Sequence, residues 1–266
     1  MKLSKKLSAM LAIFAVSTFA LTGCGENPDQ NQNSANPPAN STALKVGTAA
    51  DYAPFAFQNE NQVQGFDIDL INAIGKEIGK NVQIEDVKFQ ELISSVESKK
   101  IDVAINGITI NGERKALVAF SDPYFKSGLQ ILVKEDNTDI NSQADLSGKR
   151  IAVQEGTTSE TLANGIENAA VTKFATPDEA YKALQDGQAD AVINDRPVNE
   201  YLIKENKLAG VKALPESLNE EEYGIAIAKD NADLQKQIND ALKKLQDNGE
   251  FGKITEKWFG SQQTQQ

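Results

Sequence analysis

From Leu44 onward, short apolar segments alternate with segments whose apolar residues recur at helical spacing, and this alternation constrains the fold most. The first half predicts strands at 44–48, 82–88 and 101–106 and helices at 65–80 and 89–99. The second half predicts strands at 150–154, 171–174 and 190–194 and helices from Ser159 and from Thr176, where Thr-Pro-Asp-Glu has capping-box spacing. Such alternation is typical of βα units and a largely parallel sheet, so we predict an α/β fold.

Two segments of the chain also resemble each other. Residues 100–107 (KIDVAING) align with residues 188–195 (QADAVIND), and each follows an expected helix. Two equivalent strands would therefore end at Asn106-Gly107 and at Asn194-Asp195. Ligands of open α/β sheets bind beyond the carboxyl ends of the strands. If the two halves form similar lobes, we expect these two ends to face each other across a cleft.

The order of the remaining elements predicts how the lobes are connected. Expected strands at 129–134 and 223–228 suit crossings between lobes, and a long amphipathic helical region, 232–259, follows the second one. We therefore predict a first lobe at 44–132 plus 224–260 and a second lobe at 133–223. Two extended segments would form the hinge between them.

The N-terminal residues predict export of the protein. Three lysines precede an apolar run at 7–21, which is short for a membrane span, and the run ends in Leu-Thr-Gly-Cys24. This tetrapeptide resembles the lipobox of bacterial lipoproteins, which implies a signal peptide at 1–23 and a lipidated Cys24 that anchors the protein to the outer side of a membrane. An ordinary signal peptide with a chance cysteine is the alternative. Residues 24–43 are rich in Asn, Gln, Pro and Ser and should form a flexible tether, and 261–266 a disordered tail.

Several classes of chemistry are excluded by composition. The chain has no histidine and one cysteine, so it lacks a Ser-His-Asp or Cys-His system, a His-containing zinc site and an internal disulfide. It contains no P-loop and no Gly-x-Gly-x-x-Gly between a strand and a helix. The formal charge of −11 argues against a nucleic-acid partner. We expect no metal, no cofactor and no nucleic acid.

Six motifs, at 47–55, 65–70, 106–115, 120–125, 154–158 and 191–195, resemble the solute-binding protein family 3 in order and spacing. These are the polar-amino-acid receptors of ABC importers, and the likeness is closest to glutamine-binding proteins. It covers nearly all of 44–260. The resemblance implies a periplasmic-binding-protein-like type II fold, with two α/β lobes joined by a two-segment hinge. It also implies a monomeric, non-enzymatic receptor that closes around a free amino acid and delivers it to a membrane permease.

The resemblance assigns roles in holding the ligand carboxylate. The residue that matches the carboxylate clamp is Arg114, and a guanidinium suits a carboxylate because its donors form a planar fork. The alternative is a surface helix arginine beside Glu113. Thr109 would add its hydroxyl and Gly107 its carbonyl, although both could be ordinary turn residues. Thr157 matches the second-lobe partner of the carboxylate, with a plain helix cap as its alternative.

The remaining family positions bind the rest of the ligand. Asp195 matches the acceptor of the α-ammonium group, and its alternative role is to cap the helix that starts around Pro197. Tyr52 and Phe89 match aromatic walls around the ligand side chain, although either could belong to the core. Asn106 completes the predicted ligand-binding set at the end of the first-lobe strand.

Departures from the family pattern bear on the ligand's identity. Ala49 stands where many members have Asp, Asn111 where Thr or Pro is usual, and Asn194 where a glutamine binder has His. With Gln154 and Thr158, these residues would form a neutral polar pocket, so we favour glutamine. Arginine or lysine ranks second, because Ala49 removes one obvious partner for a cation, although Asp51 and Glu155 could restore that charge. Two other functions stay open: a dehydratase of arogenate or prephenate, which shares the fold, and a sensor or adhesin that binds the same ligand without transport.

Overall fold

The structure is a computed structural model that describes residues 43–260. The predicted signal peptide (1–23), lipidation of Cys24, residues 24–42 of the tether and the tail (261–266) lie outside the described residues. Within 43–260, no helix combines the length and the apolar character that a membrane crossing requires.

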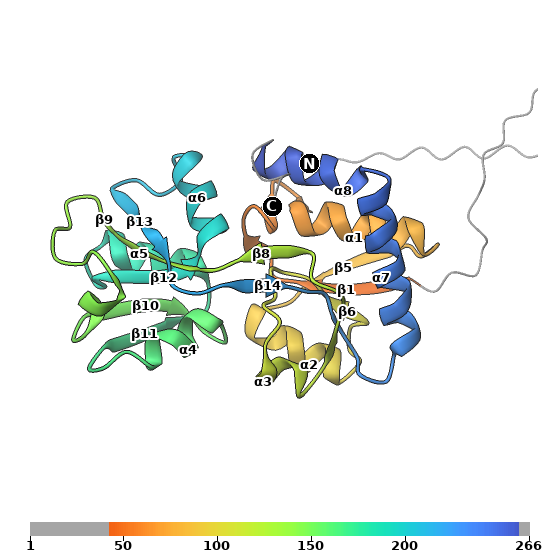
Figure 1. The fold of residues 1–266 in the computed structure, drawn as a ribbon, viewed down its shortest axis with the longest axis horizontal. Helices are drawn as coiled ribbons and strands as arrows, with labels where there is room; N and C mark the ends of the chain where they lie inside the picture. The colour runs from red at the N-terminus through yellow and green to blue at the C-terminus, as the bar shows by residue number, and fades with distance from the viewer. Residues whose placement is uncertain (1–42, 261–266) are drawn as a thin grey trace, which may run out of the picture. The chain divides into compact units, whose positions relative to one another are not determined.

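Two five-stranded sheets organise the described chain (Figure 1). The first has the order β5-β1-β6-β15-β7 and the second β11-β10-β12-β9-β13. In each sheet the first three strands pair in parallel and the last two pairings are antiparallel, so both sheets are mixed, and only β15 and β9 run opposite to the other strands of their sheets. The strands of the first sheet are β1 (Leu44–Thr48), β5 (Val82–Asp86), β6 (Val103–Ala104), β7 (Ala119–Phe120) and β15 (Ala226–Ile227). Those of the second are β9 (Leu129–Lys134), β10 (Arg150–Gln154), β11 (Ala170–Phe174), β12 (Ala191–Asp195) and β13 (Val211–Ser217).

Helices follow the strands in both halves of the chain. In chain order they are α1 (Phe66–Glu77), the 3-10 helix η1 (Phe89–Glu91), α2 (Leu92–Glu97), α3 (Gly112–Lys115), the 3-10 helix η2 (Gln143–Leu146), α4 (Thr158–Asn164), α5 (Pro177–Gln185), α6 (Arg196–Lys204), α7 (Ala232–Asp247) and α8 (Glu250–Phe259). The predicted capping box at Thr176 is confirmed at the start of α5. The predicted helical region 232–259 is confirmed, and it consists of two helices, because Gly249 takes a left-handed conformation (φ 78°) and separates α7 from α8.

The equivalence of the two aligned segments is confirmed by the sheets. β6 and β12 occupy corresponding places, since each pairs in parallel with the first strand of its half and antiparallel with a strand on its other side. Asn106-Gly107 and Asn194-Asp195 thus follow or end equivalent strands.

The chain crosses between the sheets at β8 (Phe125–Ser127) and β14 (Glu221–Tyr223), which pair antiparallel (Figure 1). The predicted crossing at 129–134 is wrong: it forms β9, which is almost wholly buried within the second sheet. A continuous apolar run is typical of a strand covered on both faces, and this is the physical reason for the difference. The predicted crossing at 223–228 divides into the end of β14 and β15. A small sheet of β2 (Asp51–Tyr52), β3 (Ala56–Asn59) and β4 (Gln62–Gln64) precedes α1.

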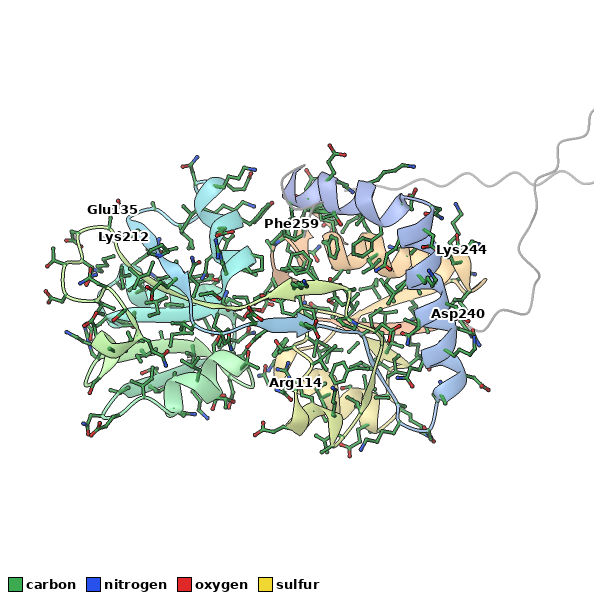
Figure 2. All side chains as sticks on the ribbon, in the orientation of Figure 1. Arg114, Glu135, Lys212, Asp240, Lys244 and Phe259 are labelled. Carbon is green, nitrogen blue, oxygen red and sulfur yellow. The ribbon has the colours of Figure 1, made fainter. Side chains whose placement is uncertain are left out.

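Aromatic packing fixes the crossing strands against the first lobe. The ring of Phe125 in β8 lies 5.1 Å from that of Phe55 and 5.0 Å from that of Phe259 at the end of α8 (Figure 2). The ring of Tyr223 in β14 lies 5.3 Å from that of Phe55 and is fully buried. This cluster positions the Tyr223 hydroxyl near the second lobe.

Candidate ligand-binding site

A small cavity is lined by residues from both lobes. They are Tyr52, Phe89, Gly107, Thr109, Arg114, Gln154, Thr157, Thr158, Ser159, Asn194 and Asp195. All but one of the predicted ligand-binding residues belong to this lining, and the exception is Asn106. The cavity has room for little more than one water molecule, so the lining must move apart to admit a larger molecule.

Arg114 lies on the short helix α3 and is 9% exposed (Figure 2). The Asn111 side chain caps this helix by accepting from the Arg114 amide at 2.9 Å. The guanidinium donates to the Thr109 carbonyl (2.9 Å) and, across the lobes, to the Gly156 carbonyl (3.1 Å). Its Cζ lies 5.4 Å from the Phe89 ring centroid. The alternative of an exposed surface arginine is therefore wrong.

The Arg114 cation lacks a direct counter-charge. Among residues 43–260 its guanidinium forms no ion pair, and both of its side-chain hydrogen bonds go to backbone carbonyls. Burial lowers its pKa, and the more distant charges of Asp195 and Glu221 oppose that shift. A buried cation without a paired anion is costly. The site is thus suited to an anionic group with planar acceptors.

Asp195 is the last residue of β12, and its charge is opposite to that of Arg114. Its Oδ2 accepts hydrogen bonds from the hydroxyls of Tyr52 and Tyr223, both at 2.5 Å. The side chain makes no capping hydrogen bond to α6, so its proposed alternative role as a helix cap is wrong. Burial and the charge of Glu221 raise its pKa to about 7, although both tyrosines and Arg114 oppose the rise. A ligand cation would favour the carboxylate form.

A second buried acid, Glu221, accepts from two lining threonines. Its Oε2 takes hydrogen bonds from the hydroxyls of Thr109 (2.6 Å) and Thr158 (3.2 Å). The sequence analysis missed Glu221, since it stands in the run Asn-Glu-Glu-Glu, which is typical of a solvated surface. Its neighbours Glu220 and Glu222 are exposed, and only the middle acid is buried at 7% exposure.

Thr157 acts as a helix cap. Its hydroxyl accepts from the Glu160 amide (3.2 Å) and donates to the Gln154 carbonyl (2.7 Å). The hydroxyl proton is thus already used, and the structure supports the capping alternative for this side chain. Gln154 donates through Nε2 to the Ala175 carbonyl at 3.2 Å.

Asn106 and Asn194 differ in position. Asn106 is fully buried behind the cavity, where its Nδ2 donates to the Ala49 carbonyl (3.0 Å) and to the Thr48 hydroxyl (3.3 Å). Its predicted contact with ligand is not supported by this geometry. Asn194 lines the cavity, and its Nδ2 donates to the Tyr181 hydroxyl at 2.5 Å.

Gly107 brings the backbone close to the cavity. Its φ is 56°, and an added Cβ would lie 3.2 Å from both the Tyr52 and the Tyr223 rings. Its amide donates to Oδ2 of the fully buried Asp67 at 2.7 Å. Burial raises the pKa of Asp67 to about 7, and the Gly107 amide partly opposes this.

Neither acid proposed to replace the charge absent at Ala49 lines the cavity. Asp51 lines a different surface pocket, between the β2–β3 region and α5. Glu155 is exposed and lies 3.9 Å from Lys173 Nζ. Ser159, a lining residue that the sequence analysis missed, has a buried hydroxyl without a hydrogen-bond partner. In the described part of the chain, no group of three or more His, Cys, Asp or Glu residues could hold a metal ion.

Comparisons with known proteins agree with this architecture. The model of the bacterial extracellular solute-binding proteins, family 3, matches residues 44–261. The arginine-binding extracellular protein ArtP of Bacillus subtilis (strain 168) is 34% identical over 256 residues, which cover 94% of this chain and 96% of that protein. Solved structures of an ancestral arginine-binding protein, bound to arginine or to glutamine, are both 44% identical and cover 82% of this chain and 98% of theirs, with TM-scores of 0.79 and 0.77.

Proposed function

Because the chain belongs to the bacterial extracellular solute-binding proteins of family 3, we propose that it captures a free amino acid for an ABC importer. One observation carries the proposal: the cavity holds a buried arginine that forms no ion pair within 43–260, and a buried carboxylate of opposite sign. An α-amino acid carries a carboxylate and an ammonium group close together, which would satisfy both.

In the proposed complex, Arg114 holds the α-carboxylate and Asp195 the α-ammonium. Arg114 comes from the first lobe and Asp195 from the second, so one small ligand contacts both lobes. A ligand that binds the closed state better than the open state shifts the balance toward closure. The paired strands β8 and β14 would act as the hinge. The predicted division into lobes at 44–132 plus 224–260 and 133–223 remains part of the proposal, except that residues 129–132 pass with β9 to the second lobe.

Glutamine is the favoured ligand. Apart from Arg114 and Asp195, the lining consists of neutral residues, including Gln154, Thr158 and Asn194. A cationic side chain would meet no additional carboxylate among the lining residues. The ancestral protein that is 44% identical is bound to glutamine in one structure and to arginine in another. Arginine or lysine therefore remains the alternative ligand class.

The proposal places the protein outside the cytoplasm, on a membrane anchor at Cys24. The Leu-Thr-Gly-Cys24 tetrapeptide supports this part of the proposal. A lipid anchor at Cys24 would hold the protein on a membrane stably with two acyl chains, whereas one chain would not. Expression of Cys24→Ser should move the protein from the membrane fraction to the soluble exported fraction. Recovery of this variant in the membrane fraction at the wild-type level would contradict the anchor.

A thermal-shift screen of the purified protein against the common amino acids tests the proposed receptor role. A ligand that binds only the folded state raises the melting temperature by mass action. We expect a specific shift with L-glutamine and recovery of unchanged amino acid from the complex by mass spectrometry, which separates a receptor from the dehydratase alternative. The absence of a shift with any amino acid at millimolar concentration would contradict the proposal.

A further inference from the structure

Glu221 lies on β14, one of the two crossing strands, and is 7% exposed (Figure 1). Its two carboxylate oxygens accept three hydrogen bonds. Oε2 takes the hydroxyls of Thr109 and Thr158, and Oε1 takes the Asn219 side-chain amide at 3.0 Å. Both threonines line the cavity, whereas Glu221 itself lies behind them.

This arrangement fixes the direction of two hydroxyl protons. A threonine hydroxyl has one proton to donate and two lone pairs that accept. Thr109 and Thr158 each donate that proton to Glu221, because an ionised carboxylate can only accept. Only lone pairs then remain for the cavity. Neither hydroxyl can donate to the ligand's carboxylate, so the predicted role of the Thr109 hydroxyl in holding that carboxylate is not supported by this geometry. Both hydroxyls can accept from a ligand N–H.

We propose that Glu221 is a positioning residue, which holds the Thr109 and Thr158 hydroxyls as acceptors for N–H groups of the bound amino acid, the α-ammonium group first. The inference rests on the proposed amino-acid-binding function and deepens it. The ammonium group would then be surrounded by Asp195 and by oriented neutral acceptors, while Arg114 serves the carboxylate.

The carboxylate of Glu221 is itself held by the crossing segments. Asn219, which donates to Glu221, accepts through Oδ1 from the Leu129 amide at 2.8 Å. A Cβ added at Gly128 would lie 2.3 Å from the Asn219 carbonyl oxygen, so the two crossing segments approach closely at this point. Thr109 belongs to the first half of the chain and Thr158 to the second. Glu221 therefore links both sides of the cavity to the hinge.

The competing interpretation is that Glu221 acts through its charge. Burial lowers the pKa of Arg114, and the charges of Asp195 and then Glu221 oppose that shift. Burial raises the pKa of Asp195, and the charge of Glu221 adds to that rise. Glu221→Gln separates the two interpretations, because the one amide oxygen can still accept both threonine protons while the charge and the hydrogen bond from Asn219 are lost. Glu221→Met removes the acceptors at nearly constant size. The neighbouring exposed acid supplies the matched control, Glu222→Gln.

Calorimetric titration with L-glutamine and L-arginine, on the purified protein and these variants, tests the inference. For the amino acid that the wild type binds, we expect Glu222→Gln and Glu221→Gln to stay within about threefold of the wild-type Kd. We expect Glu221→Met to weaken binding by roughly five- to fiftyfold, the range for losing the pairing of buried polar groups. In a Thr109→Val background, Glu221→Met should cost markedly less, since the coupled hydroxyl is gone.

Each outcome decides the inference. A loss of tenfold or more in Glu221→Gln would overturn it in favour of a charge effect, and this result does not depend on whether Glu221→Met folds. Unchanged affinity in a folded Glu221→Met would overturn it as well, with the proposed receptor function intact. If the wild type binds neither these two nor any other common amino acid, the proposed function and this inference both fail.

Discussion

The ends of β6 and β12 are equivalent in the two sheets and both contain Ile-Asn, yet they contribute differently to the cavity. At the first, Asn106 turns away and Gly107 supplies backbone. At the second, Asn194 and Asp195 both line the cavity with side chains. The same two tyrosines, Tyr52 and Tyr223, lie against both ends: their rings would lie 3.2 Å from a Cβ at Gly107, and their hydroxyls donate to Asp195.

The comparison shows that a repeated strand fixes where a site lies but leaves its chemistry to single positions. Gly107 has no side chain to offer at the first strand end. The charged group of the first lobe is instead Arg114, which comes from α3. The two lobes therefore present opposite charges to the cavity. The following changes test this division, from the largest expected effect to the smallest.

Arg114→Ala should remove the positive charge that the first lobe presents to the cavity. We expect binding of L-glutamine to weaken by about 2–5 kcal/mol, the usual range when one partner of a buried charge pair is lost. Calorimetry measures this effect directly. Lys115→Ala, on the same helix but exposed, is the control and should leave the affinity unchanged. Equal affinities of Arg114→Ala and the control would contradict the clamp.

Asp195→Asn should remove the anionic side while keeping the size of the group. We expect a loss of about 1.5–3 kcal/mol in binding, the range for hydrogen bonds to a charged group. The unliganded protein should not lose stability, because the change removes a buried charge whose pKa is raised by burial. Retained affinity would show that the ammonium group binds elsewhere.

Gly107→Ala tests the backbone contribution of the first strand end. The positive φ costs about 1–2 kcal/mol in any non-glycine residue, and the close tyrosine rings add to that cost. Gly148→Ala is the matched control, since its φ is 75° and an added Cβ meets nothing within 4 Å. Chemical denaturation should show a larger loss of folding free energy for Gly107→Ala. Equal losses would mean that the tyrosine rings yield without cost.

The acid on the second strand end also predicts a pH dependence. The pKa of Asp195 is about 7, and the ligand ammonium requires the carboxylate form. Below about pH 7 the ligand must displace a proton, so Kd should rise by up to about tenfold per pH unit. The same raised pKa makes the unliganded fold less stable as pH rises from about 4 to about 7, because the folded state binds a proton that the unfolded state lacks. A flat profile of Kd between pH 8 and pH 6 would contradict this, and Asp195→Asn should be flat.

Tyr52→Phe should have the smallest effect. It removes one of two hydroxyl donors to Asp195 and keeps the ring beside Gly107. We expect a change in ligand binding of about 0.5–1.5 kcal/mol, the net range for one hydrogen bond. Calorimetry on this variant, with the half-buried Tyr201→Phe as control, measures it. A loss as large as that of Asp195→Asn would mean that Tyr52 contacts the ligand charge itself.

The sequence was informative where a local pattern fixes a local structure. Alternating apolar segments located the main strands, and Thr176-Pro-Asp-Glu located the start of α5. The family motifs contain nine lining residues from distant parts of the chain, and Phe89 is a tenth that the family resemblance predicts outside them. The side-chain directions were not predictable, since Asn106 and Asn194 each follow an isoleucine at the end of an equivalent strand and yet have different hydrogen-bond partners.

Glu221 shows the limit most clearly. Three consecutive acids are normally solvated, and only the path of β14 past Thr109 and Thr158 buries the middle one. The path of β9 was misjudged for a related reason, because its burial depends on β12 and β13, which are distant in sequence.

The central claim, that opposite charges from two lobes hold the two ends of a free amino acid, is tested most directly by calorimetry with blocked ligands. L-glutamine, its α-amide and its N-acetyl derivative would each be titrated into the purified protein. We predict one molecule of L-glutamine per chain and loss of measurable binding when either end is blocked. Binding of either blocked derivative with the affinity of L-glutamine would contradict the claim.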